Sequence, residues 1–136
     1  MKNIHGNLIT LAGQGKFDVI VHGCNCLHRM RSGIAGQLAR TYPKVEEVDR
    51  TTKYGDVNKL GTFSHVEVDS VTAPGNRFTV VNLYTQYTYG RDPDSVYVHY
   101  DSLRRGMMAV VDWAMREYGA EVRIGIPLIG CGLNGS

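Results

Sequence analysis

The sequence lacks the features that would place it in a membrane, outside the cell or on a nucleic acid. Its apolar runs, such as Val19–Val21, are far shorter than a membrane span. The opening residues MKNIHGNLIT contain no apolar segment of the kind that a secretory signal needs. Fifteen basic and thirteen acidic residues leave a net charge of +2, which is too small to indicate a nucleic-acid-binding face. We therefore expect no membrane partner and no direct nucleic-acid partner.

Cysteine is also scarce, and its placement does not suit a disulfide framework. The chain has three cysteines, and Cys24 and Cys26 are separated by one residue. An odd number and such close spacing favour reduced thiols, so we expect a cytoplasmic protein. The 136 residues, 43% of them hydrophobic, are enough for one domain with a real core but not for two. We therefore expect a single domain over residues 1–136.

What the chain does contain is an alternation of strand-like and helix-like segments. Short apolar or alternating runs predict strands over residues 16–23, 61–68, 76–85 and 121–130. Apolar residues at helical spacing predict helices over 32–42, 44–52 and 101–118, the last capped by Asp101 or Ser102 and ending at Gly119. This order predicts an α/β domain with a largely parallel sheet.

Three segments rich in glycine and polar residues follow predicted strands, at residues 22–35, 84–89 and 130–136. In open α/β sheets, ligands bind beyond the carboxyl ends of the strands. If the strands are parallel, the three segments gather at one edge of the sheet. This convergence predicts a ligand site there.

The first of these segments, HGCNCLHRMRSGIA, allows several chemistries. Cys24, Cys26 and His28 alternate and could share a face toward a metal, but no second ligand pair with the usual spacing is evident. A thiolate nucleophile beside His22 or His28 is a second possibility. Buried thiols at the bend between a strand and a loop are the alternative to both. The pattern AGQGKFD does not fit a dinucleotide site, because it precedes a strand and lacks the third glycine.

A phosphate-binding loop is a further interpretation, and it applies twice. In RSGIA, Gly33 lets the backbone approach a ligand where a strand turns into a helix, whose N-terminus favours anions. In IGCGLNG, Gly130, Gly132 and Gly135 allow consecutive N–H groups to face one anion. Two such loops could hold a diphosphate, and two tight turns are the simpler alternative.

Several motifs in one order extend this interpretation to nearly the whole chain. GNLI, DVIVHGCNC, SGIAGQL, YPKVEEV, KYGDVNKLG, VVNLYTQY and PLIGCGLNG together resemble the macrodomain family, whose members bind ADP-ribose. The run HGCNC…SGIAGQLARTYPK is similar to the branch that contains ADP-ribose-1''-phosphate phosphatases and the phage and bacterial ADP-ribose-1''-phosphate processing proteins.

The resemblance implies a three-layer α/β/α sandwich with a mixed, largely parallel central sheet. Macrodomains usually continue past the second loop into a further helix and a final strand, which lies between the first strand and the strand at 121–128. Because the sequence stops at Ser136, inside that loop, we expect a domain that lacks this helix and strand and is truncated at its C-terminus.

The resemblance also implies the residues of the site. Most macrodomains have an aspartate that holds the adenine amino group where this chain has Asn7, whose oxygen can still accept from that amine. Asn25 corresponds to the asparagine that contacts the distal ribose, and residues 32–35 and 130–135 to the two diphosphate loops. The implied ligand-binding set is Asn7, Leu8, Asn25, Ser32, Gly33, Ile34, Ala35, Tyr84, Gln86, Gly130, Cys131, Gly132, Leu133, Asn134 and Gly135.

His22 corresponds to a histidine implicated in catalysis, where it would act as a general base or acid. A core histidine is the equally weighted alternative, and Asp56 is a possible helper. In a related branch a lysine and an aspartate carry the chemistry; here these positions hold Gln86 and Asn134, which disfavours that mechanism. Arg29 and Arg31 could bind a terminal phosphate or be solvated loop residues.

Two functions follow from the resemblance. The first is hydrolysis: a phosphatase acting on ADP-ribose-1''-phosphate, or a related hydrolase of ADP-ribosyl groups. The second is recognition of ADP-ribose, free or attached to macromolecules, without turnover. Neither requires a metal or a cofactor.

Overall fold

A mixed four-stranded sheet forms the centre of the computed structural model, which describes residues 7–31, 33–88 and 100–127. The strands are β1 (Val19–Asn25), β2 (Phe63–Asp69), β3 (Arg77–Gln86) and β4 (Ile124–Gly125), in the spatial order β2-β3-β1-β4. β1 runs parallel to β3 and β4, whereas β2 is antiparallel to β3. The prediction of a mixed, largely parallel sheet is confirmed.

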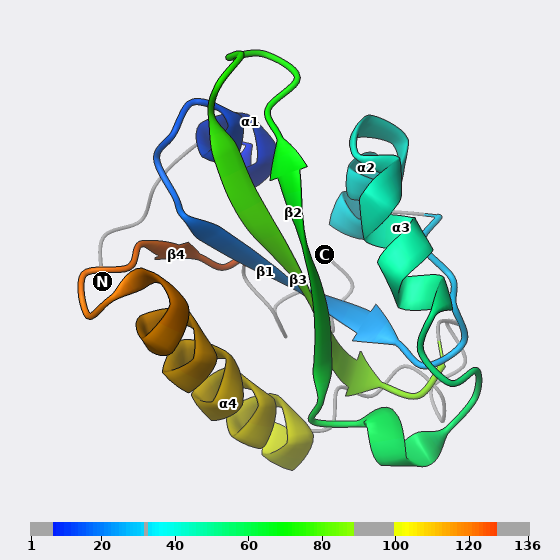
Figure 1. Ribbon diagram of the computed structural model, residues 1–136. Coiled ribbons are helices and arrows are strands. Elements are labelled where there is room, and N and C mark those ends of the chain that lie inside the picture. The colour runs from blue at the N-terminus through cyan, green and yellow to red at the C-terminus, as the bar shows by residue number, and fades with distance from the viewer. Residues whose placement is uncertain (1–6, 32, 89–99, 128–136) are drawn as a thin grey trace.

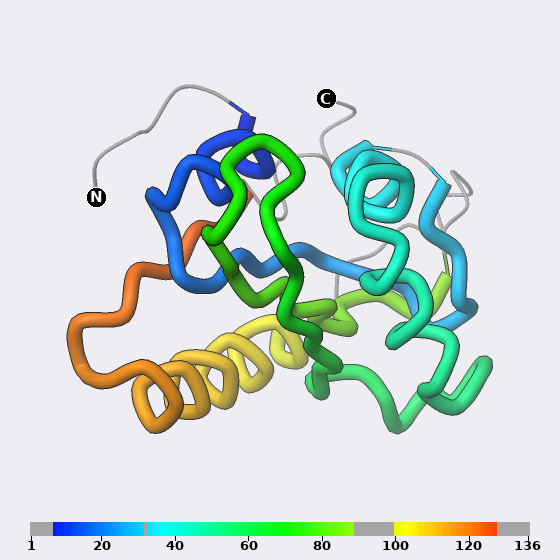
Figure 2. Tube along the Cα trace, turned by 45° about the horizontal axis from the view of Figure 1, so that its top comes forward, coloured from blue at the N-terminus to red at the C-terminus, as the bar shows by residue number. Residues whose placement is uncertain are grey.

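Helices cover both faces of this sheet (Figures 1 and 2). On one face lie α1 (Leu8–Gly13), α2 (Gly33–Thr41) and α3 (Pro43–Arg50); on the other lies α4 (Tyr100–Tyr118). A short 3-10 helix, η1 (Val57–Lys59), precedes β2. The predicted three-layer α/β/α sandwich is therefore present.

Alternation of side chains along the buried strands produces the two halves of the core. On β1, Ile20 and Cys24 pack toward α1–α3, whereas Val19 and Val21 pack toward α4. All four side chains are buried, as expected for a strand covered on both faces. α4 approaches the sheet closely at Gly106, where an added Cβ would lie 2.4 Å from Leu83 Cδ1.

Two predicted details of the helices were wrong. α1 was not predicted, because six residues are too few for a helical pattern. The signal that could have revealed it is Asn7, whose side chain caps the helix. α4 begins at Tyr100, so Asp101 and Ser102 lie in its first turn and not before it. Ser102 is instead buried and accepts a hydrogen bond from Arg105.

The C-terminal expectations fall mostly outside the described residues. β4 is described only at Ile124–Gly125, and both residues pair with β1, at Val19 and Ile20. No strand therefore lies between β1 and β4. Residues 128–136 are outside the described part, and the truncation stays a prediction.

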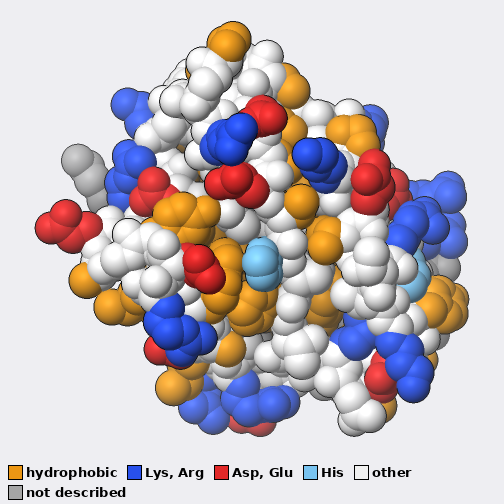
Figure 3. All heavy atoms as spheres, in the orientation of Figure 1, with side chains coloured by type: hydrophobic (Ala, Val, Ile, Leu, Met, Phe, Trp, Pro, Cys, Tyr) orange, Lys and Arg blue, Asp and Glu red, His pale blue; other side chains and the backbone are white. Residues whose placement is uncertain are grey.

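The surface of the described part carries mixed charge. Basic and acidic side chains are interspersed on the face shown in Figure 3. None of the helices among residues 7–31, 33–88 and 100–127 combines the length and the apolar character needed to cross a bilayer.

A row of polar side chains crosses three neighbouring strands beneath α3. His22 on β1, Asn82 on β3 and Ser64 on β2 are direct cross-strand partners. His22 Nε2 donates to Asn82 Oδ1 at 2.6 Å, and Asn82 Nδ2 donates to Ser64 Oγ at 3.1 Å and to the Val45 carbonyl at 3.2 Å. His22 is 1% exposed, and burial lowers its pKa from 6.5 to about 4, against the opposing effect of the bond to Asn82.

The row predicts a loss of stability in mild acid. The unfolded chain protonates His22 near pH 6.5 and the folded protein only near pH 4, so the free energy of unfolding falls as the pH drops through this window. The shift corresponds to about 3 kcal/mol. His22→Gln keeps a donor for Asn82 but does not titrate, so urea unfolding between pH 7 and 4 should show a shallower decline. His65→Gln, at an exposed histidine, is the control. Parallel curves for His22→Gln and wild type would refute this assignment.

Candidate functional site

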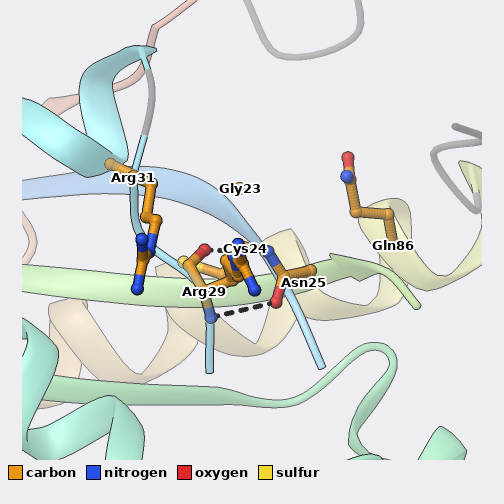
Figure 4. A pocket seen from close by; sticks show the side chains of 7 residues that line it. Gly23, Cys24, Asn25, Arg29, Arg31 and Gln86 are labelled. Carbon is orange, nitrogen blue, oxygen red and sulfur yellow. Dashed lines mark hydrogen bonds between the residues drawn. The ribbon is translucent and has the colours of Figure 1, made fainter. Parts of the chain in front are cut away.

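A cavity of about 340 Å³ opens at the carboxyl end of β1, where the sequence predicted a ligand site. Its lining comes from the end of β1, the following loop, the first turn of α2 and the end of β3 (Figure 4). The lining residues are Gly23, Cys24, Asn25, Arg29, Arg31, Ala35 and Gln86. Ligand sites in open α/β sheets occupy this position.

An irregularity in strand pairing brings Gln86 to the cavity. Cys24 on β1 pairs with Tyr84 on β3, but the next residue, Asn25, pairs with Gln86, so Thr85 is an extra residue on β3. A bulge of this kind redirects the side chains that follow it. Asn25 and Gln86 consequently stand opposite each other and both line the cavity. Gln86 Nε2 donates to the Thr88 carbonyl, which fixes the side chain further.

The Thr85 side chain also explains why residue 23 is a glycine. Thr85 is 1% exposed, and its Oγ1 would lie 2.8 Å from a Cβ added at Gly23. Any larger residue at position 23 would have to displace this threonine. Glycine at this position therefore follows from the close packing against Thr85, and its backbone contributes to the cavity lining.

Asn25 organises the loop that leaves β1. Its Oδ1 accepts from the backbone N–H of Leu27 at 2.9 Å and of Arg29 at 3.3 Å, and its Nδ2 donates to the Arg29 carbonyl at 2.9 Å. The side-chain amide therefore holds both backbone groups of Arg29. Among the described residues, the second Nδ2 hydrogen of Asn25 has no acceptor.

Two arginines, Arg29 and Arg31, contribute the positive charge of the cavity, and both are exposed. No acidic residue lines the cavity among the described residues. A guanidinium offers paired N–H donors that match the oxygens of a phosphate or carboxylate. The cavity is thus chemically suited to an anionic group.

The first predicted diphosphate loop lies beside the cavity, and part of it is described. Gly33 begins α2 with a φ of +59°, a conformation that favours glycine, and a Cβ there would meet nothing within 4 Å. Ala35 lines the cavity, whereas Ile34 packs against the core. Ser32 and the whole second loop, residues 130–135, lie outside the described residues.

His22 lies behind the cavity wall. It does not line the cavity, and its contact toward it is Cys24, whose Sγ is 3.7 Å from Nδ1 and 3.5 Å from Nε2. Burial raises the pKa of the Cys24 thiol well above its ordinary value, so this thiol is not an activated nucleophile. The proposed helper Asp56 instead caps η1, accepting from Asn58 N, and is not a partner of His22 in the described structure. Catalysis by His22 stays a prediction.

Tyr84 belongs to the core. It is 1% exposed, and its hydroxyl donates to Asp49 Oδ1 at 2.6 Å. Lys59 Nζ lies 4.5 Å from the centre of the Tyr84 ring and has no hydrogen-bond partner among the described residues. The tyrosine thus donates a hydrogen bond to a buried aspartate and presents its ring face to a buried lysine. The ligand contact predicted for Tyr84 stays a prediction that this geometry does not support.

Asn7 and Leu8 lie apart from this cavity. Asn7 Oδ1 caps α1, accepting from Ile9 N at 2.8 Å and Thr10 N at 3.4 Å, so its two acceptor positions are occupied. Asn7 lines a second cavity of about 290 Å³, between α1 and α2. Leu8 packs against the core beside Gly125. The adenine contact predicted for Asn7 therefore stays a prediction.

Gly23 and Cys24 line the cavity but were missing from the predicted ligand-binding set. A glycine inside a buried strand signals that something approaches the backbone closely, and this signal could have identified Gly23. Arg29 and Arg31, which were left open between phosphate contact and solvation, are both at the cavity.

Comparison with known proteins identifies one curated relative. The chain is 37% identical over 134 residues to an uncharacterized 17.5 kDa protein from the tk-vs intergenic region of Enterobacteria phage T4. The match covers 98% of this chain and 79% of that protein. No family model matches the chain.

Solved structures with the same fold include macrodomains. The macrodomain of Thermus aquaticus DarG superposes with a TM-score of 0.65 at 20% identity, covering 95% of this chain and 76% of that one. Thermosipho africanus DarTG, solved in complex with ADP-ribose, superposes with a TM-score of 0.67 at 14% identity, covering 92% of this chain and 33% of that one. The chain therefore belongs to the family of the phage T4 17.5 kDa protein, and its fold is that of a macrodomain.

Proposed function

We propose that the protein binds ADP-ribose, with the distal ribose in the cavity at the end of β1. The observation that carries the proposal is the composition of that cavity, which joins Asn25, Gln86, Ala35 and two arginines at the carboxyl edge of parallel strands. The Thermosipho africanus protein that shares this fold was solved with ADP-ribose, which supports the choice of ligand.

In this proposal, different parts of the cavity contact different parts of the ligand. The remaining Nδ2 hydrogen of Asn25 donates to a ribose hydroxyl. The open backbone at Gly33 and the N-terminus of α2 face the diphosphate, because helix N-termini favour anions. Gly23, which also lines the cavity, would lie beside the sugar.

We further propose that the preferred ligand carries a phosphate on the distal ribose, as in ADP-ribose-1''-phosphate. Unmodified ADP-ribose has no charge at that end, yet Arg29 and Arg31 line the cavity there. A terminal phosphate would pair with these guanidinium groups.

Titration calorimetry with ADP-ribose, ADP-ribose-1''-phosphate, AMP and NAD tests the proposal. We expect both ADP-ribose ligands to bind. Arg31→Ala should weaken the binding of ADP-ribose-1''-phosphate by about tenfold or more, since hydrogen bonds to charged groups contribute about 1.5–3 kcal/mol. The affinity of the same variant for ADP-ribose should fall much less. Arg50→Ala removes an exposed arginine that pairs with Glu46 on α3 and serves as the control. If neither ADP-ribose ligand binds, the proposal is wrong.

Hydrolysis of that phosphate is the second candidate function, favoured by the same two arginines. In it, a water would attack the phosphorus while the bond between phosphorus and the ribose 1'' oxygen breaks. His22 Nδ1 would take up the proton of that water by way of the Cys24 thiol, which lines the cavity, and the departing ribose oxygen would be protonated from solvent. A pKa of about 4 makes His22 a weak base at neutral pH, so the binding function is the better supported of the two.

Phosphate release from ADP-ribose-1''-phosphate separates the two functions. The hydrolase proposal expects release by the wild type and its loss in His22→Gln, with ADP-ribose affinity retained. His65→Gln should behave as the wild type. Binding without release by the wild type would reject hydrolysis and leave a recognition module.

A further inference from the structure

We propose that His28 is a positioning residue that sets the preference for a phosphorylated distal ribose by fixing Arg29 at the cavity. The inference rests on the proposed function, since it concerns how that same site distinguishes two ligands. It does not require catalysis.

His28 has an unusual backbone conformation. Its φ is +52°, the one positive value at a non-glycine residue in the described chain. This region is unfavourable for most side chains and is maintained only where surrounding contacts determine it. His28 lies between Asn25 and Arg31, in the loop that contributes two arginines to the cavity.

The His28 side chain supplies those contacts. Its Nε2 donates to the Thr52 carbonyl at 2.8 Å, and Thr52 Oγ1 lies 3.3 Å away. Its ring meets Tyr54 edge-on, with the centroids 5.4 Å apart. The loop is thereby attached to the chain that follows the C-terminus of α3.

The attachment point is itself fixed. Thr52 donates to the Asp49 carbonyl from both its backbone N–H, at 3.0 Å, and its Oγ1, at 2.6 Å. Asp49 is 1% exposed and accepts from Tyr84 in the core. His28 therefore connects the loop to a rigid part of the protein.

Arg29 is held on both sides as a result. On one side Asn25 binds the N–H and the carbonyl of Arg29, and on the other His28 is anchored to Thr52. These contacts fix the backbone of Arg29, so the loop that carries its guanidinium loses less conformational freedom when the guanidinium meets a phosphate. Releasing the anchor should weaken contacts at the terminal phosphate and spare contacts to ADP-ribose itself.

The test compares the ratio of the two dissociation constants, for ADP-ribose and ADP-ribose-1''-phosphate, in variants of His28. His28→Gly accepts the positive φ without strain but removes the anchor. We expect the preference for the phosphorylated ligand to fall about fivefold, a fraction of what a charge-assisted hydrogen bond supplies. Affinity for ADP-ribose should change by less than about twofold. His28→Gln, which retains a donor of similar reach, should restore part of the preference.

The controls separate positioning from general destabilisation. His65→Ala removes a histidine from β2, away from the cavity, and should leave the ratio unchanged. Thermal unfolding of each variant reports stability independently of the ratio. A purely structural role for His28 would lower stability or weaken both ligands equally, and an unchanged ratio in His28→Gly would overturn the proposal.

The wild-type titrations keep this inference distinct from the proposed function. If the wild type binds both ligands and only the effect of His28→Gly is absent, the inference fails alone. If the wild type binds ADP-ribose without preferring the phosphorylated form, the inference is overturned while ADP-ribose binding stands. If the wild type binds neither, both fail together.

Discussion

The parallel pairing of β1 with β3 is the interaction on which the rest of the structure depends. It is continuous from Val19 to Cys24 and then shifts by one residue, so that Asn25 meets Gln86. The regular part builds both halves of the core, because successive side chains of β1 enter opposite layers. The shifted part ends the regular ladder and opens the cavity. Fold and site are thus two consequences of one strand pair.

The site is held in shape by contacts within the protein itself. Thr85 requires glycine at position 23, Asn25 holds the backbone of Arg29, and His28 ties the same loop to Thr52. A cavity whose parts are already in place binds with a smaller loss of conformational freedom than one that must be assembled. Such positioning of the cavity residues suits recognition of a ligand, which needs well-placed hydrogen-bond donors more than it needs a reactive side chain.

Much of the fold was predictable from the sequence, because the apolar periods of β1, α2 and β3 are strong and their order limits the topology. The site was predictable as a location, since it follows from where parallel strands end. Individual roles were less predictable. Asn7 and Tyr84 have chemistry that suits a nucleotide, yet one caps α1 and the other bonds Asp49 in the core. The cap by Asn7 is a local contact with Ile9 and Thr10. The role of Tyr84 and the anchor of His28 depend on Asp49 and Thr52, which are distant in sequence, so neither composition nor spacing reveals them.

The central claim is that the cavity at the end of β1 is where ADP-ribose binds. Titration of isotope-labelled protein with ADP-ribose, followed by the backbone amide resonances in NMR spectra, tests this claim most directly. We expect saturable shifts at Gly23, Asn25, Arg31 and Gln86, with little change at exposed positions on α4 such as Met108. Absence of shifts, or shifts confined to the second cavity around Thr10 and Thr72, would contradict it.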